Sequence, residues 1–162
     1  MNLKFLFLIG LLFLSRSVFA SEASYLKERS EIQEKLIYEY AIAWDQKDCD
    51  RWANLFTTDA ILDLSGDGNL ASTMKRAQGR NEIREFCTRR MNTALTNVKS
   101  HHFMTNTVFT EISSSKAVSS TYALVTWKTP SAEKPSIQTS IVYHDQIVKE
   151  NGRWLLKERL VK

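Results

Sequence analysis

Several protein classes are excluded by what this chain of 162 residues lacks. Its two cysteines are too few for a disulfide scaffold or for a zinc site made of thiolates alone. Two prolines mark no boundary between domains, and no internal repeat or low-complexity tract is present. The signatures of serine hydrolases, zinc proteases, P-loops and dinucleotide sites are also absent. We therefore expect one domain whose functional residues are scattered along the chain.

The only long apolar run lies at the N-terminus, over residues 5–14. It is shorter than the roughly 20 residues that span a membrane. With basic flanks, no acidic residue, and Ala20 before Ser21, residues 1–20 resemble a cleavable signal peptide. An uncleaved N-terminal anchor is the alternative. We expect a secreted or periplasmic protein, cut between Ala20 and Ser21, with no membrane anchor after cleavage and one domain over residues 21–162.

The mature chain is expected to carry little net charge. Loss of Lys4 and Arg16 with the signal peptide lowers the basic count from 22 to 20 against 18 acidic residues, a net charge of +2. The densest basic stretch, residues 75–90, is interrupted by Glu82 and Glu85 and holds a single aromatic residue, Phe86, not the interleaved aromatic residues of a site for single-stranded nucleic acid. This pattern is typical of a solvated helix face, and we expect no nucleic-acid partner.

The two cysteines, Cys49 and Cys87, both remain after cleavage. In an exported protein they can form one disulfide. The alternative is two buried free thiols.

Apolar spacing predicts helices in the first half of the mature chain. Between residues 22 and 44, an apolar residue recurs at every fourth position: Ile32, Leu36, Tyr40 and Trp44. Asp48 is a predicted N-cap for a short second helix. Residues 59–64 are predicted to form a strand. A third helix is predicted to follow Gly79.

The second half has the pattern of a sheet. Long β-like segments cover 98–112, 116–128, 137–149 and 153–161, with turn residues between them. Helices first and an antiparallel meander afterwards predict the α+β class.

Charge pairing predicts the register of the last hairpin. A two-residue Asn151-Gly152 turn would pair Glu150 with Arg153 and set Asp145 directly opposite Glu158, an unfavourable pair of like charges. A three-residue loop pairs Lys149 with Arg153 instead and brings opposite charges together. It also sets Tyr143 opposite Arg159, so we expect this register, with Gly152 at positive φ.

The remaining notable residues form an ordered set. It reads Tyr40-x4-Asp45-x2-Asp48, Trp52-x3-Phe56-x2-Asp59-Ala60, Gly79-Arg80-x2-Ile83-x2-Phe86, His102-x3-Asn106, Tyr143-x-Asp145 and Gly152-Arg153-Trp154-x4-Arg159. In order and spacing it resembles the SnoaL-like branch of the NTF2-like superfamily, across essentially the whole mature chain. The resemblance implies a cone: N-terminal helices packed on a strongly curved antiparallel sheet that surrounds a pocket.

The resemblance also implies site residues, because this branch includes bile-acid dehydratases and a dehydrochlorinase. In those lyases an Asp at the end of the first helix pairs with a His on a long strand, here Asp45 and His102. The dehydratases add a Tyr and an Arg at positions matched by Tyr40 and Arg159. Their further acid on the fourth segment has no counterpart in residues 118–127, and residues 65–78 match nothing useful.

The implied chemistry is an elimination or isomerisation that needs no metal or organic cofactor. A carboxylate on the far nitrogen of a neutral imidazole fixes its tautomer and makes it a good base near neutral pH. Arg159 and Tyr40 would stabilise an anionic oxygen or protonate a leaving group. We assign Tyr143, Asn106 and Trp44 to substrate contact.

Each assignment has a structural alternative. Asp45 can simply end a helix, His102 can be a hydrogen-bonded sheet histidine, and Arg159 can be a surface charge. Five helical steps turn about 140°, so Tyr40 and Asp45 do not share a face of an ideal helix.

Two functions follow as hypotheses. The first is a cofactor-free lyase (dehydratase) or isomerase acting on a small hydrophobic molecule, in a chain that forms a homodimer. The second is a non-catalytic small-molecule-binding or dimerisation module, because this fold serves both roles.

The export hypothesis predicts a defined N-terminus. Sequencing of the protein secreted by its own cell should begin at Ser21 or within a few residues of it. Recovery of the chain with Met1 intact from the cytosolic fraction would contradict the hypothesis.

Overall fold

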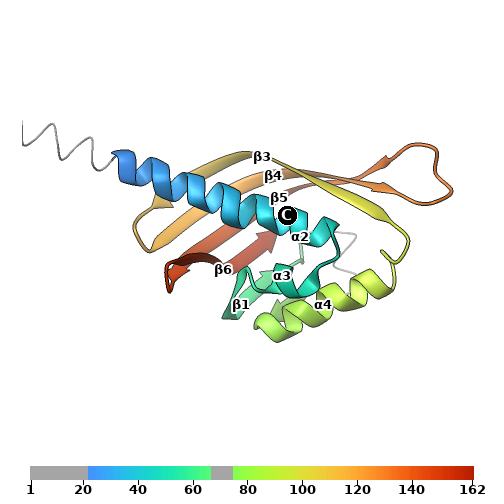
Figure 1. Cartoon of the computed structure of the whole chain (residues 1–162), viewed down its shortest axis with the longest axis horizontal. Helices are drawn as coiled ribbons and strands as arrows, with labels where there is room; N and C mark the ends of the chain where they lie inside the picture. Colours follow the sequence, from blue (N-terminus) through green and yellow to red (C-terminus); the bar gives the residue numbers. More distant parts are fainter. Residues whose placement is uncertain (1–21, 67–74) are drawn as a thin grey trace, which may run out of the picture.

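The structure, a computed structural model, describes residues 22–66 and 75–162. The expected signal peptide, and residues 67–74 of the unmatched segment, lie outside the described residues. Within the described part, helices pack on one face of a six-stranded curved sheet, as Figure 1 shows. The expected α+β class and the packing of N-terminal helices on a curved sheet are confirmed. No helix in this part is both long and apolar enough to cross a membrane.

The first helical run covers residues 22–45 and includes a π-helical turn, η1 (Gln33–Ile37), followed by α2 (Tyr38–Asp45). The expected apolar stripe is buried: Ile32, Leu36, Tyr40 and Trp44. On an ideal α-helix, each step of four residues overshoots a full turn by about 40°. A π turn holds an extra residue and so slows this rotation. The π turn thus helps to keep Ile32 and Trp44 on the face that packs against the sheet.

The strands follow the order β2-β1-β6-β5-β4-β3. Their bounds are β1 (Phe56–Asp63), β2 (Arg76–Gln78), β3 (Lys99–Ile112), β4 (Lys116–Lys128), β5 (Ser136–Glu150) and β6 (Arg153–Val161). The last four agree with the predicted segments to within about one residue at each end. The pairing of β1 with β6 is parallel and the others are antiparallel, so the sheet is mixed and not wholly antiparallel as expected.

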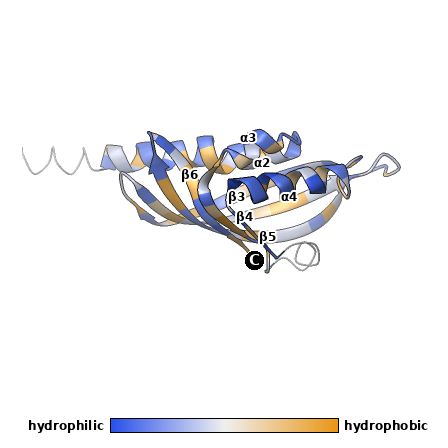
Figure 2. Ribbon diagram, turned by 90° about the horizontal axis from the view of Figure 1, so that it is seen from below, coloured by the Kyte–Doolittle hydropathy of each residue, from blue (hydrophilic) through white to orange (hydrophobic). Residues whose placement is uncertain are grey.

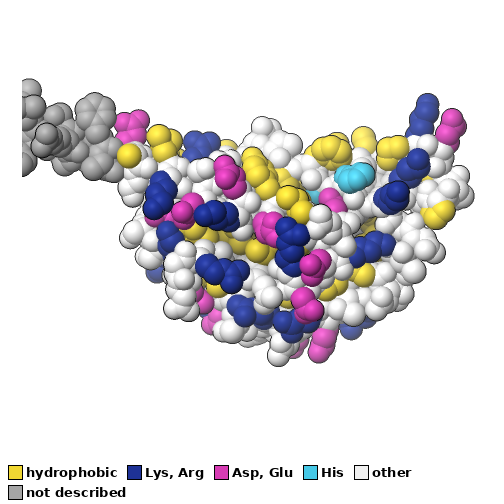
Figure 3. All heavy atoms as spheres, in the orientation of Figure 1, with side chains coloured by type: hydrophobic (Ala, Val, Ile, Leu, Met, Phe, Trp, Pro, Cys, Tyr) yellow, Lys and Arg dark blue, Asp and Glu magenta, His cyan; other side chains and the backbone are white. Residues whose placement is uncertain are grey.

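Two further helices cover the same side of the sheet (Figure 2). α3 (Cys49–Ala53) begins at Asp48, whose carboxylate accepts a hydrogen bond from the backbone of Arg51 at 3.0 Å, as an N-cap should. α4 (Arg80–Asn92) follows Gly79, whose φ of 84° suits glycine. The outer surface of α4 is hydrophilic in Figure 2. In Figure 3, Lys and Arg side chains lie interspersed with Asp and Glu on the face shown.

Aromatic rings fill much of the space between the helices and the sheet. The buried rings are Tyr40, Trp44, Trp52, Phe56 and Phe86. Their centroids lie between 4.9 Å apart, for Trp44 and Trp52, and 6.5 Å apart, for Trp52 and Phe86. Tilted and edge-on contacts of this kind add to the free energy gained by burying the rings.

The β5–β6 turn differs from the prediction. Glu150 pairs with Arg153, which leaves Asn151 and Gly152 as a two-residue turn with φ of 50° and 76°. Positive φ at both central positions is the mark of a type I′ turn, which suits the twist of a hairpin. The predicted three-residue loop, with Lys149 opposite Arg153, is wrong. The positive φ at Gly152 is confirmed.

A β-bulge in β6 explains why the charge argument failed. Beyond Leu156 the register shifts by one residue and leaves Lys157 as the extra residue. Asp145 therefore lies opposite Arg159 and not opposite Glu158, so the like charges are separated without a longer loop. Leu156 and Arg159, three residues apart, are both fully buried. Strict alternation would forbid this, so the bulge is what turns Arg159 inward.

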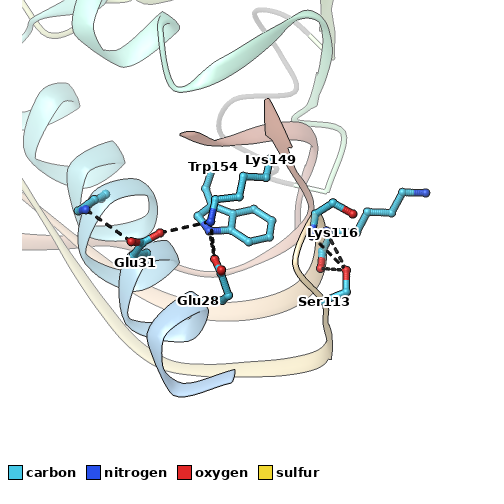
Figure 4. A network of polar contacts seen from close by, with 8 residues as sticks. Glu28, Glu31, Ser113, Lys116, Lys149 and Trp154 are labelled. Atoms are coloured by element: carbon cyan, nitrogen blue, oxygen red, sulfur yellow. Dashed lines mark hydrogen bonds and ion pairs between the residues drawn. The ribbon is translucent and has the colours of Figure 1, made fainter. Parts of the chain in front are cut away.

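A shielded carboxylate fastens the start of the first helical run to the β5–β6 hairpin (Figure 4). Glu28 accepts hydrogen bonds from Lys149 Nζ at 2.7 Å and from Trp154 Nε1 at 2.9 Å. Glu31 lies 3.5 Å from the same ammonium. The hydrogen bond from Lys149 lowers the pKa of Glu28, and the smaller opposing effect of burial does not cancel it.

Replacement of Glu28 by Gln should therefore lower the free energy of unfolding by about 1–2 kcal/mol at neutral pH. Because the pKa of Glu28 is lowered on folding, its ionised form stabilises the fold above the ordinary pKa, and this is lost as pH falls through the folded pKa. Urea unfolding near pH 7 and near pH 3 measures both. The difference between wild type and variant should close in acid. Glu31→Gln is the control, with a smaller effect; a Glu28 effect that persists in acid would contradict the assignment.

Candidate active site

Asp45 is the last residue of α2, and the chain turns away directly after it. Lys47 adopts φ of 60°, and its ammonium donates hydrogen bonds to the carbonyls of Leu95 and Thr96 at 2.6 and 2.9 Å. These contacts hold the end of the helix against the segment that leads into β3. The Asp45 side chain therefore faces β3.

Three hydrogen bonds hold the Asp45 carboxylate. Oδ1 accepts one from Ser100 Oγ at 2.9 Å and lies 2.7 Å from His102 Nδ1. Oδ2 accepts one from the backbone N–H of His102 at 2.8 Å. The expected contact between Asp45 and His102 is thus present. An ionised carboxylate only accepts hydrogen bonds, so Nδ1 carries a proton in this contact; in the neutral ring, Nε2 is then the nitrogen with the lone pair.

The imidazole of His102 is largely shielded from water. Its side chain is 9% exposed and that of Asp45 is 18% exposed. The Trp44 ring stands edge-on to it, with 6.3 Å between the ring centroids. The neighbouring residue, His101, is exposed because it lies on the outer face of β3. A shielded imidazole with one unprotonated nitrogen has the arrangement that a general base requires.

A second polar cluster surrounds Arg159. Its Nε and Nη2 donate to the two oxygens of Asp145, each at 2.7 Å, and both side chains of this pair are fully buried. The centre of the guanidinium lies 3.9 Å from the Tyr40 ring centroid and 4.3 Å from that of Tyr143. Tyr143 and Arg159 thus touch, although they are diagonal neighbours and not the directly opposite pair that was predicted.

Burial and the ion pair set the ionisation of this cluster. Burial raises the pKa of Tyr40, and the smaller effect of the Arg159 charge opposes it. Burial alone would lower the pKa of Arg159, but the Asp145 carboxylate outweighs it and the pKa lies above its ordinary value. Tyr40 is therefore a neutral hydroxyl and Arg159 a cation at physiological pH.

The two clusters lie along one helix and are separated by aromatic rings. Tyr40 contacts the Arg159 cluster, and Asp45, at the helix end, contacts β3. Between them, Trp52 lies 5.2 Å from the Tyr40 ring and 4.9 Å from the Trp44 ring. The angular separation of Tyr40 and Asp45 expected from the sequence is therefore real: each serves a different cluster.

The assigned substrate-contact residues have different surroundings. Trp44 packs beside His102, and Tyr143 packs against Tyr40 with 5.6 Å between the ring centroids. Asn106 lies in a bulge of β3, with φ of 49° and an exposed side chain. Trp44 therefore contacts the Asp45–His102 pair, through the ring of His102.

An open groove of about 710 Å³ reaches Asp45 from outside. Its lining includes Ile42, Lys47, Lys99, Ser100 and His101. No three His, Cys, Asp or Glu side chains in the described part of the chain gather closely enough to hold a metal ion.

The family model for the SnoaL-like domain matches residues 24–160. The chain belongs to the SnoaL-like domain family. No curated protein matches the chain.

Solved structures share the SnoaL-like fold at low sequence identity. A putative scytalone dehydratase from Novosphingobium aromaticivorans is 20% identical, with a TM-score of 0.71 over 87% of this chain and 87% of that one. An NTF2-like protein with a cystatin-like fold from the same organism is 17% identical, with a TM-score of 0.73 over 88% and 86%. A variant of a protein of unknown function from Mycobacterium tuberculosis is 23% identical, with a TM-score of 0.71 over 86% and 73%. These likenesses establish the fold.

Cys49 and Cys87 of this SnoaL-like chain are joined in a disulfide, one of the two alternatives that the sequence allowed. The bond links the first turn of α3 to α4 across 38 positions of sequence. Cys49 follows Asp45 by four residues, so the disulfide anchors the segment just beyond the Asp45–His102 pair. Cross-linking of this kind stabilises a fold chiefly by restricting the unfolded chain.

Sequence reasoning missed two residues of these clusters. Ser100 lies two positions before His102, so strand alternation places both on one face and offered a usable signal. Asp145 was named in the ordered set but was given no role in the site, and the bulge that brings it opposite Arg159 left no recognisable trace in the sequence.

Proposed function

We propose that this SnoaL-like protein is a cofactor-free lyase, acting as a dehydratase, or an isomerase, and that His102 is its general base. The observation that carries the proposal is the Asp45–His102 pair. One carboxylate holds both the Nδ1–H and the backbone N–H of His102, at 2.7 and 2.8 Å. This arrangement leaves Nε2 as the basic atom, with its tautomer and direction fixed.

In a dehydration, Nε2 takes a proton from a carbon next to a carbonyl group. The electron pair of the broken C–H bond forms the new C=C bond, and a β-hydroxyl leaves as water after the His102 imidazolium returns the proton to it. The Asp45 carboxylate stabilises the imidazolium formed in the first step. In an isomerisation, the same nitrogen returns the proton to another carbon of the substrate.

The proposed substrate is a small hydrophobic molecule that carries a carbonyl group. Trp44, Met104 and Trp127 offer apolar surface on the inner side of the fold, where His102 also lies. Shielding of the imidazole favours proton abstraction from carbon, since water competes less for the base. The putative scytalone dehydratase with the same fold is consistent with this reaction class.

We also propose that the protein is exported and works in a secreted or periplasmic setting. The layout of residues 1–20 motivates this proposal. The Cys49–Cys87 disulfide supports it, because structural disulfides persist mainly in oxidising compartments.

A second candidate function, assembly, has support on the outer face of the sheet. Large apolar side chains there are strongly exposed: Phe103 is 53%, Tyr122 is 51% and Val108 is 56% exposed. The register of β3 and β4 places them on the face opposite His102. Contiguous exposed apolar surface commonly marks a protein–protein interface. We propose that a second copy of this chain covers this face in a homodimer.

The homodimer proposal predicts that Tyr122→Glu separates the two copies, because a charge would be buried in the interface. Sedimentation velocity should give a dimer for wild type and a monomer for the variant. Ile42→Glu, on the helical side, is the control and should remain dimeric. Wild type that sediments as a monomer would contradict the proposal.

The lyase proposal predicts that His102→Ala lowers turnover by roughly 10²–10⁴-fold. A screen of β-hydroxy ketones, guided by mass spectrometry of any molecule that co-purifies, supplies the substrate. Asp45→Asn should also reduce turnover, because an amide can hold the ring in the wrong tautomer.

His144→Ala is the matched control, since this histidine is hydrogen-bonded to Ser120 on β4 and lies outside the groove that reaches Asp45. It should leave turnover unchanged. If His102→Ala lowers the melting temperature but not the turnover of the folded protein, His102 is structural and the lyase proposal fails.

A further inference from the structure

Ser100 occupies a place in β3 where the buried face of a strand favours an apolar residue. It lies on the same face as His102, two residues before it, and is 5% exposed. Its hydroxyl donates a hydrogen bond to Asp45 Oδ1 at 2.9 Å. A buried hydroxyl that lacks a partner costs free energy, so this bond is what makes a serine tolerable here.

The hydrogen bond of Ser100 ends on the same carboxylate oxygen that the His102 ring uses. Nδ1 lies 2.7 Å from Asp45 Oδ1, whereas the backbone N–H of His102 donates to Oδ2 at 2.8 Å. Donors on both oxygens fix the plane of the carboxylate, because hydrogen bonds to charged groups are strong and directional. Rotation of the carboxylate would therefore break the bonds of Ser100 and of the His102 ring together.

Attachment of the helix does not depend on the Ser100 bond alone. Lys47 joins the end of α2 to the carbonyls of Leu95 and Thr96. The backbone N–H of His102 joins Asp45 to β3. What Ser100 adds is a donor on the one oxygen that faces the imidazole.

We propose that Ser100 is a positioning residue, whose hydroxyl holds Asp45 Oδ1 at the point where it meets Nδ1–H of His102 and thereby fixes the direction of Nε2. This inference rests on the proposed function. Ser100 acts through Asp45 and not on the substrate. Its hydrogen bond also takes up part of the negative charge of Oδ1, and so limits how strongly Asp45 stabilises the imidazolium.

The surroundings of His102 leave one route from Ser100 to the ring. Among the described residues, Asp45 is the titratable group that contacts the ring; Trp44 stands edge-on to it, and Val125 lies opposite His102 on β4. Other charged or titratable side chains of the adjoining segments line the groove outside: Lys47, Lys99 and His101. A change at Ser100 therefore reaches the base through the Asp45 carboxylate.

The test compares Ser100→Thr with Ser100→Val, two side chains of nearly the same shape that differ in the hydroxyl. Ser100→Val should lower kcat about 10-fold with little change in KM, because the lost bond supports the imidazolium-forming transition state. Ser100→Thr should keep most of kcat. The acid limb of the pH–rate profile should move to higher pH in Ser100→Val, since an unshared carboxylate makes the imidazolium easier to form.

Ser119→Val is the matched control. Ser119 is a buried serine on the inner face of β4, and its Oγ forms no hydrogen bond with the described residues. This variant should keep the kcat and the pH–rate profile of wild type. Equal losses of kcat in Ser100→Val and Ser100→Thr would show an effect of size alone and would overturn the inference. If Ser100→Val does not fold, Ser100→Ala replaces it, with the same expected direction.

A double-variant cycle shows whether Ser100 acts through Asp45. In the Asp45→Asn background, Ser100→Val should cause little further loss of kcat, because no carboxylate remains to be positioned. Losses that multiply would mean that the two side chains act independently, which contradicts the inference.

Nitrogen-15 NMR of the His102 ring gives a reading that needs no turnover. The Nδ1 signal should change in Ser100→Val and stay close to wild type in Ser100→Thr. An unchanged signal in folded Ser100→Val overturns the inference, whatever the turnover of that variant.

These outcomes separate the inference from the proposed function. If His102→Ala abolishes turnover while folded Ser100→Val keeps wild-type kcat, Ser100 is only structural and this inference fails alone. If His102→Ala leaves turnover unchanged, the proposed function fails, and the ring signal still decides whether Ser100 positions the imidazole.

Discussion

The bond between the end of the first helix and strand β3 is the contact on which the candidate site depends. The Asp45 carboxylate accepts hydrogen bonds there from Ser100 and from the backbone and ring of His102, beside the bonds from Lys47 to Leu95 and Thr96. β3 is one of the two edge strands of the described sheet, so this contact holds the helix end at the margin of the sheet. The same bonds that dock the helix also fix the imidazole.

This double use has an energetic consequence. An ionised carboxylate at the end of a helix faces the unfavourable end of the helix dipole. Three hydrogen bonds, one from an imidazole ring, offset that cost and the partial loss of hydration. The arrangement holds the helix end to β3 and, in the proposed function, also orients the base.

Most of the fold could be predicted from the sequence because the spacing of apolar residues and the choice of turn residues act locally. The apolar stripe from Ile32 to Trp44 and the four long strands were predicted nearly to the residue. The Asp48 cap was also foreseen, since a cap needs only its own side chain and the next turn. The π turn in the first helix was not predicted, although the four-residue spacing that it accommodates was visible.

The candidate site was only half predictable. Asp45 and His102 were identified by resemblance, and the structure brings them together. The register of β5 and β6 was wrong because a bulge at Lys157 depends on contacts across three strands. That bulge turns Arg159 inward onto Asp145, so the partner of Arg159 was unpredictable from pairwise charge alone.

The central claim is that Asp45 holds His102 as a neutral base with Nε2 unprotonated. Nitrogen-15 NMR of the His102 ring, in the protein without substrate at neutral pH, tests this directly. The account predicts a proton on Nδ1 and a lone pair on Nε2, with Asp45→Asn disturbing that tautomer. A ring that carries its proton on Nε2, or that is doubly protonated at neutral pH, would contradict the account.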